Sequence, residues 1–272
     1  MDLLTHPPRW APLVGPGVWT DLVVAHLGGA EITDEGDHLR VVTPGNPTFW
    51  WGNYLDVLAP SRAADVDLWL ARFEAAFPDA RHRTFGLPGP VSDAWLDRGF
   101  TPEVVVTLLA DGPVEAGPPV PGYSVRVFGE DAPWQDAVEL HVEHHDGPAT
   151  PERYREFTER RVESQARMTA AGTARFLGAY EADRCVAHLG AVRCGEVGRY
   201  QSVLTHAGHR GRGLAGHLVG LAATWLRAGG CDRLVIVTEE DNPAGRLYRR
   251  LGFDGTDLAY GVSVPDVARL SR

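Results

Sequence analysis

A segment rich in proline and glycine, residues 110–122, divides the 272-residue chain into halves of comparable size. Proline and glycine at this density disfavour both helix and sheet, so we expect an extended linker here. Each half is long enough to bury a hydrophobic core of its own. The sequence therefore predicts two domains, at residues 1–112 and 123–272, joined by a linker at 113–122.

The overall composition indicates a water-soluble globular protein. Hydrophobic residues make up 44% and charged residues 23% of the chain, and no apolar run reaches the roughly 18 residues that a membrane span needs. The first ten residues do not resemble a signal peptide. The formal net charge of −10 argues against nucleic-acid binding. We therefore expect a cytoplasmic protein that acts on a small-molecule or peptide partner and binds neither nucleic acid nor membrane, with its oligomeric state left open.

Lysine and cysteine usage narrows the possible chemistry. The sequence contains no lysine, so all 26 basic residues are arginines. This excludes a Walker phosphate loop and a pyridoxal Schiff base, both of which need a lysine. The cysteines, Cys185, Cys194 and Cys231, show no CxxC spacing, so we expect reduced thiols and no metal site.

Strand-like and helix-like segments alternate irregularly along the second half. The predicted strands are 123–128, 174–180, 185–192, 199–205 and 234–238. The predicted helices are 133–145, 151–171, 214–228 and one that begins after Asn242, with Asn242 as its N-cap, and ends near Gly252. Strands and helices in this mixed order predict an α/β fold.

The first half repeats this order more loosely. Three segments of the first half resemble three segments of the second half, and they occur in the same order along the chain. The pairs are Tyr54–Leu58 with Tyr200–Leu204, Trp69–Leu70 with Trp225–Leu226, and Trp95–Phe100 with Tyr248–Phe253. Matches in constant order favour two tandem copies of one fold over chance similarity of short segments.

A glycine–arginine turn, residues 209–215, lies between a predicted strand and an amphipathic helix. Gly211 and Gly213 allow positive φ and a close approach of the backbone to a ligand. The free N–H groups and the dipole at a helix start suit a phosphate, and Arg210 and Arg212 add charged donors. The turn predicts a pyrophosphate site; the alternative is a tight basic turn without a ligand.

This turn resembles the pyrophosphate loop of the GNAT superfamily of acyl-CoA-dependent N-acyltransferases. The family pattern is Arg/Gln-x-x-Gly-x-Gly/Ala, which Arg210, Gly213 and Ala215 fill. Residues 242–253 resemble the second family signature, Asn-x-x-Ala-x-x-Leu-Tyr-x-x-x-Gly-Phe, with one residue fewer before its alanine. The resemblance covers about residues 123–264. It implies two GNAT-like domains in tandem, each with a central mixed, splayed β-sheet flanked by helices. In the second domain, the pantetheine arm of acetyl-CoA would lie in the gap between two parallel strands.

The resemblance also implies roles for individual residues and no metal. Tyr248 occupies the place of the general acid that protonates the leaving thiolate, which a phenol can do; the alternative is a packed tyrosine. Asn242 would contact the thiol arm of the cofactor, or act only as an N-cap. The implied acetyl-CoA-binding residues are Val203, Leu204, Thr205, Arg210, Gly211, Arg212, Gly213, Leu214, Ala215 and Asn242.

The sequence does not identify the general base that would accept the proton of the amine. Many relatives carry a glutamate on the strand before the loop, but this chain has Gln201, which cannot accept a proton. The predicted turn between two helices offers Glu143, His144, His145 and Asp146 as candidates. A solvated polar turn is the alternative for these four residues.

The first half lacks the features of a cofactor site. Residues 59–64 stand in place of the loop but contain no glycine, and Pro60 removes a backbone donor. The aromatic segment 49–54 is predicted to be a strand that packs in the core or walls a substrate cleft. The leading hypothesis is an N-acetyltransferase that transfers acetyl from acetyl-CoA to a primary amine by direct attack, with a degenerate N-terminal copy. The alternatives are a CoA-binding regulatory or structural protein with decayed chemistry and an unrelated phosphate-ligand binder.

Overall fold

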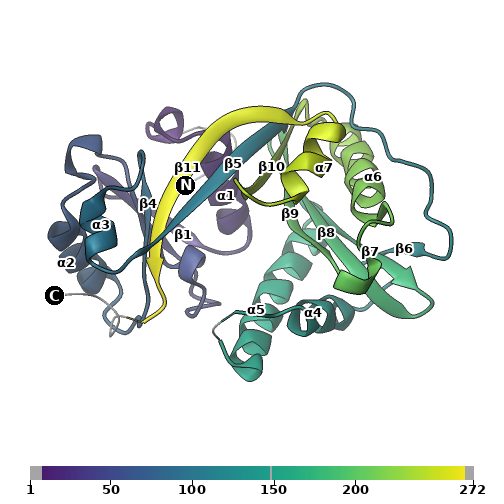
Figure 1. Cartoon of the computed structure of the whole chain (residues 1–272), viewed down its shortest axis with the longest axis horizontal. Coiled ribbons are helices and arrows are strands. Elements are labelled where there is room, and N and C mark those ends of the chain that lie inside the picture. The colour runs from purple at the N-terminus through teal and green to yellow at the C-terminus, as the bar shows by residue number, and fades with distance from the viewer. Residues whose placement is uncertain (1–7, 148, 267–272) are drawn as a thin grey trace. The chain divides into compact units, whose positions relative to one another are not determined.

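The computed structural model of the protein describes residues 8–147 and 149–266, which form a mixed α/β fold (Figure 1). The described residues divide into two compact units. Unit 1 contains residues 8–107, 238–242 and 256–266, and unit 2 contains residues 108–237 and 243–255, without residue 148. Each unit thus includes residues from both sides of the linear division that the sequence predicts. No helix in the described part of the chain has the length and hydropathy to cross a membrane.

Unit 1 is built on a mixed sheet whose strands follow the order β1-β2-β3-β4-β11. Strands β3 and β4 are parallel, and the other neighbours are antiparallel. Its strands are β1 (Glu31–Asp34), β2 (His38–Val42), β3 (Tyr54–Val57), β4 (Arg83–Leu87) and the C-terminal part of β11 (Asp254–Val264). Its helices are η1 (Ala11–Leu13), α1 (Pro16–Leu27), η2 (Trp50–Gly52), η3 (Pro60–Arg62), α2 (Val66–Ala76) and α3 (Asp93–Asp97). Strand β5 (Thr101–Ala110) runs from unit 1 into unit 2.

Large aromatic side chains fill the core of unit 1. Trp69 and Phe73 of α2 and Trp95 of α3 are fully buried against Phe85 of β4. The alternate residues of β3, β4 and β11 complete this cluster, as expected for a sheet that buries one face under amphipathic helices.

The strands of unit 2 follow the order β10-β9-β8-β7-β6, in which β9 and β10 are parallel and the other neighbours are antiparallel. Helices α4 and α5 lie together on one face of this sheet, and α6 and α7 lie on the other (Figure 1). Its strands are β6 (Ser124–Val127), β7 (Ala174–Glu181), β8 (Arg184–Cys194), β9 (Val197–Thr205) and β10 (Arg233–Glu239). Its helices are α4 (Trp134–Glu143), α5 (Pro151–Ala170), η4 (Ala207–His209), α6 (Leu214–Ala228) and α7 (Ala244–Arg250).

The same order of elements occurs twice along the chain. The series β1-β2-β3-α2-β4-α3-β5 in the first half corresponds to β7-β8-β9-α6-β10-α7-β11 in the second. In both series the third and fourth strands are parallel neighbours. This repetition agrees with the tandem, two-domain α/β fold that the sequence predicts.

Two local predictions differ from the structure. Pro243, and not Asn242, is the N-cap residue of α7, so this helix begins one residue later than predicted. The aromatic segment forms the 3₁₀ helix η2, and a strand begins only at Tyr54. The reason lies in Asn53, whose side-chain amide donates to the carbonyls of Asn46 and Phe49 at 2.9 Å. Such side chain–backbone bonds stabilise a turn in competition with a strand.

The segment predicted as a linker contains no helix or strand over residues 111–123. It nevertheless packs closely on α6. A Cβ atom added at Gly220 would lie 2.1 Å from the Cα of Ala116, and the His217 ring bonds the carbonyl of Gly117 through Nδ1 at 2.8 Å. The glycine on α6 therefore makes room for the backbone of this segment.

Candidate functional site

A β-bulge interrupts the pairing of β8 with β9. The pairs shift in register between His188–Leu204 and Gly190–Gln201. Ser202, which lies between the paired residues of β9, has a φ of 53°, a conformation that is uncommon for a residue other than glycine. A bulge bends its strand and disrupts the ladder locally, so the end of β9 turns away from a regular sheet.

The parallel pairing of β9 with β10 ends just before this bulge. The recorded pairs run from Arg233–Val197 to Val235–Arg199, although both strands continue beyond them. The part of β9 after Arg199 therefore has one edge that is not paired with β10. Val203, Leu204 and Thr205 lie on this part and are half-buried. This is the splayed sheet that the sequence predicts.

The glycine–arginine turn follows β9 directly and starts α6. Gly211 and Gly213 have φ values of 74° and 89°, which L-residues with a side chain rarely adopt. Both glycines face open space: a Cβ at Gly211 would meet nothing within 4 Å, and at Gly213 only Val120, at 3.9 Å. The turn is therefore shaped by its glycines and leaves room beside its backbone.

The start of α6 has the features of an anion site. Gly213 is the N-cap residue, no side chain caps the helix, and no acidic residue lies in its first turn. The first N–H groups of a helix have no partner within the helix, and the dipole favours a negative charge near them. Leu214 is buried under the turn and Ala215 is half-buried, so the helix start is anchored while its N-terminal side stays accessible.

Hydrogen bonds hold the two arginines of the turn in place. Arg210 donates from Nε to the carbonyl of Thr205 at 3.2 Å and from Nη2 to Nε2 of His144 at 2.6 Å. Arg212 donates from Nη1 to the hydroxyl of Tyr123 at 2.6 Å, and that hydroxyl lies 2.9 Å from Nδ1 of His209. Both guanidinium groups are thus positioned over an exposed turn.

The roles of His144 and Tyr123 in positioning these arginines were not visible in the sequence. His144 is one of four candidate bases in the turn after α4, and it is His144 that the structure brings to the loop. Tyr123 carries no motif and lies 89 residues from its partner Arg212. Only the fold could bring these two residues together.

The candidate bases of this turn differ in their surroundings. Burial lowers the pKa of His144, and the neighbouring Arg210 lowers it further. The hydrogen bond from Arg184, 2.5 Å long, lowers the pKa of Glu143. The ring of His145 stacks on Tyr154 with centroids 3.8 Å apart. Each of these three side chains is therefore already in contact with a partner side chain in this structure.

Tyr248 lies on α7, and only 5% of its surface is exposed. Burial raises the pKa of its phenol to about 12, so the phenol keeps its proton throughout the neutral pH range. Leu247 and Leu251 of the same helix pack towards Gly216 of α6, which joins α7 to the helix that follows the glycine–arginine turn. Asn242 falls in a segment assigned to unit 1, where its N–H donates to the carbonyl of Glu239 at 3.1 Å.

The corresponding place in unit 1 is built differently. Strands β2 and β3 pair in continuous register from His38–Val57 to Val41–Tyr54, without a bulge. The N-cap of α2 is Asp65, whose carboxylate accepts from the N–H of Leu68. An acidic cap satisfies the helix start and repels an anion there.

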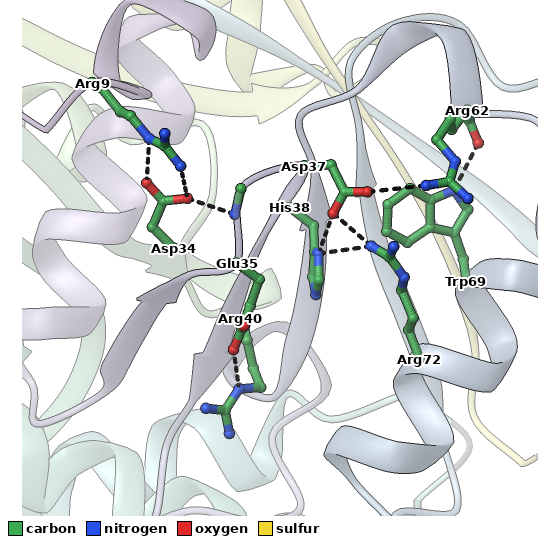
Figure 2. A network of polar contacts seen from close by, with 10 residues as sticks. Arg9, Asp34, Glu35, Asp37, His38, Arg40, Arg62, Trp69 and Arg72 are labelled. Atoms are coloured by element: carbon green, nitrogen blue, oxygen red, sulfur yellow. Dashed lines mark hydrogen bonds and ion pairs between the residues drawn. The ribbon is translucent and has the colours of Figure 1, made fainter.

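Two arginines near α2, Arg62 and Arg72, pair with a carboxylate of unit 1, as Figure 2 shows. Asp37 accepts hydrogen bonds from Arg72 at 2.5 Å and Arg62 at 3.4 Å, and it lies 2.9 Å from Nδ1 of His38. The bond from Arg72 holds the pKa of Asp37 at about 2. Both guanidinium groups thus share one internal carboxylate.

Comparisons with known proteins agree with this geometry. Residues 134–253 match the family model described as Acetyltransferase (GNAT) family. No curated protein matched the chain. Among solved structures, a GCN5-related N-acetyltransferase from Kribbella flavida is similar over 94% of this chain and 100% of its own, with a TM-score of 0.60 and 18% identity. A putative GNAT-family acetyltransferase from Novosphingobium aromaticivorans is similar over 91% and 95%, with a TM-score of 0.57 and 20% identity.

A tandem GNAT protein from the clavulanic acid biosynthesis pathway is similar over 85% of this chain and 78% of its own, with a TM-score of 0.52 and 16% identity. At these identities the similarity establishes the fold. The family match covers the bulged strand, the glycine–arginine turn and Tyr248. Residues 134–253 of this chain therefore form an acetyltransferase domain of the GNAT family.

Proposed function

We propose that the protein transfers an acetyl group from acetyl-CoA to a primary amine, at a single site in the second half of the chain. The observation that carries the proposal is the start of α6. There an uncapped helix N-terminus, two glycines with positive φ and two positioned arginines occur together. This combination suits the pyrophosphate of a CoA thioester.

The cofactor would follow the edge of β9 that β10 leaves unpaired. Backbone groups of Val203, Leu204 and Thr205 would bond the amides of the pantetheine arm, as a strand bonds an added strand. Residues 210–215 would hold the pyrophosphate. Asn242 would lie near the thiol arm, and its role does not depend on capping α7.

The reaction needs no covalent enzyme intermediate. The nitrogen of the neutral amine attacks the thioester carbonyl, a C–N bond forms, the C–S bond breaks, and the sulfur leaves as a thiolate. Tyr248 gives its proton to that thiolate and then regains a proton from water, which balances the proton that the amine releases. Gln201 cannot take the proton from the amine, and the Nε2 atom of His144 already accepts a bond from Arg210. We therefore expect water to accept the amine proton.

Unit 1 would be a copy of the fold without cofactor binding. Asp65 occupies the helix start that a pyrophosphate would need, and Asp37 neutralises the nearby arginines. This supports the interpretation of the first half as a degenerate copy.

A thermal-shift screen followed by a thiol-release assay tests the proposal. Acetyl-CoA and CoA are expected to raise the unfolding temperature, whereas ATP and inorganic phosphate at the same concentration are not. A panel of amines is then expected to release CoA from acetyl-CoA. Binding without release by any amine would instead support a CoA-binding protein with decayed chemistry, and no shift with acetyl-CoA would refute the site.

A further inference from the structure

Helix α5 turns a row of polar side chains towards the sheet of unit 2. Thr158, Arg161 and Gln165 are spaced by three and four residues, so they lie on one face of the helix. Thr158 is fully buried and Gln165 is 5% exposed. Several of their polar atoms are buried and lack a hydrogen-bond partner in the described residues: Oγ1 of Thr158, Nε and Nη2 of Arg161, and Oε1 of Gln165. Buried polar atoms without a hydrogen-bond partner are uncommon, and a group of them on one helix face calls for an explanation.

No carboxylate pairs with Arg161 among the residues that the structure describes. Phe157 lies under its guanidinium, with 5.3 Å from Cζ to the ring centroid. Its other neighbours are Tyr154, which forms a hydrogen bond with the guanidinium group, and two buried imidazoles, His141 and His188, which are 2.9 Å apart. Burial lowers the pKa of His188 to about 3 and that of His141 well below its usual range, so both are neutral at pH 7. The positive charge of Arg161 therefore has no counter-charge of its own.

Two other arginines of this chain indicate which group the unpaired Nε–Nη2 edge of Arg161 would bind. Arg9 donates from Nε and Nη2 to the two carboxylate oxygens of Asp34, at 2.9 and 3.1 Å; Figure 2 shows this pair. Arg233 binds Asp111 through the same two atoms, at 2.6 and 3.1 Å. The Nε–Nη2 edge is a planar fork that matches a carboxylate bidentately. The Nε and Nη2 atoms of Arg161 form this same edge, and both are buried without a hydrogen-bond partner among the described residues.

The position of this edge relates it to the acetyl-transfer site. Gln165, one helical turn from Arg161, donates to the hydroxyl of Ser202 at 3.1 Å. Ser202 lies in the bulge of β9, next to the segment proposed to bind the pantetheine arm. The polar face of α5 is therefore hydrogen-bonded to the strand along which the thioester would lie.

We propose that Arg161 binds a carboxylate of the acceptor, so that the acceptor is an amine that also carries a carboxylate group, as an amino acid does. The carboxylate would accept both N–H groups of the Nε–Nη2 edge. Oε1 of Gln165 would accept a hydrogen bond from the amine nitrogen. This inference rests on the proposed N-acetyltransferase function and names its substrate class.

Matched pairs of acceptors test the substrate class. Each of the common amino acids is compared with its carboxamide, which keeps the amine and side chain but removes the negative charge, in the thiol-release assay with acetyl-CoA. The best acids are expected to have kcat/KM values about 10²-fold above those of their amides, because an unpaired buried charge would remain with the amide. Equal values for acids and amides would refute this inference and leave the proposed function standing. If neither series releases CoA but another amine of the panel does, this inference is refuted and the proposed function stands. If no amine of any kind releases CoA, both are refuted.

Arg161→Met tests the residue. The variant is expected to lose the preference for acids while its affinity for acetyl-CoA stays within about threefold of the parent. It should unfold at the same or a higher temperature, since it removes a largely desolvated charge with which no carboxylate pairs among the described residues. The control is Arg160→Met on the outer face of α5, where Arg160 pairs with the exposed Glu156; it should keep the preference. A preference retained in Arg161→Met, or a marked fall in its unfolding temperature, would overturn the assignment.

Discussion

Tyr248 is the residue on which the proposed proton transfer depends. Its phenol is protonated at neutral pH and can therefore donate a proton, although burial raises its pKa to about 12 and makes it a weaker acid than a free phenol. Tyr248→Phe keeps the ring that packs with Phe253 and removes only the hydroxyl. Turnover is expected to fall about 10²–10⁴-fold, the usual contribution of a general acid, with acetyl-CoA affinity and thermal stability nearly unchanged. Turnover within about threefold of the parent would show that water protonates the thiolate.

Asp56 is expected to make the stability of the protein depend on pH. It is buried on β3, its Oδ2 atom has no partner among the described residues, and burial raises its pKa to about 7. In the unfolded chain this pKa is about 4. Between about pH 4 and 7 the folded state therefore binds more protons than the unfolded state. The contribution of Asp56 to stability accordingly falls as the pH rises through this window and is constant above it.

Asp56→Asn removes this ionisation. Urea denaturation at pH 4 should give similar free energies of unfolding for variant and parent, whereas at pH 8 the variant should be more stable by about 1–4 kcal/mol. Asp97→Asn, at an exposed position near the end of α3, serves as the control and should show no such growth with pH. The same difference at both pH values would contradict a raised pKa for Asp56.

At the scale of elements, the effect of the glycine–arginine turn on acetyl-CoA binding can be distinguished from the backbone strain that alanine causes at any glycine with positive φ. Gly213 and Gly230 flank α6 with nearly equal φ values, 89° and 88°, and neither has an atom within 3.8 Å of an added Cβ. Alanine at either position costs about 1–2 kcal/mol for its left-handed conformation. Gly213→Ala is also expected to disturb the first N–H groups of α6 and to weaken acetyl-CoA binding about tenfold or more.

Isothermal titration with acetyl-CoA distinguishes the two variants. Gly230→Ala should lose similar stability but bind as the parent does, because it lies at the opposite end of the helix. If Gly213→Ala also binds as tightly as the parent, then the start of α6 does not hold the pyrophosphate.

At the scale of the whole molecule, the two copies of the fold are expected to differ in cofactor binding. Asp65 caps α2, whereas α6 begins without a side-chain cap. We therefore expect calorimetric titration to give one acetyl-CoA per chain. Two equivalents per folded chain would instead give the first half a cofactor site, and the interpretation as a degenerate copy would be wrong.

The order of strands and helices, the tandem repeat and the glycine–arginine turn could be read from the sequence. These features depend on local periodicity, on helix signals and on the backbone freedom of Gly211 and Gly213, which are properties of short segments. Helix α6 has the predicted bounds for the same reason. The aromatic segment before β3 was predicted wrongly because the hydrogen bonds of the Asn53 side chain outweighed strand propensity.

Only the tertiary structure decided the features that depend on distant parts of the chain. The bulge at Ser202 arises from the pairing of β9 with β8, and its positive φ occurs at a residue that gives no glycine signal. Strand β11 joins β4, so unit 1 is completed by the other end of the chain. The unpaired Nε–Nη2 edge of Arg161 is also a tertiary property. A sequence shows that an arginine is present, but whether a carboxylate lies opposite it depends on which elements pack against its helix.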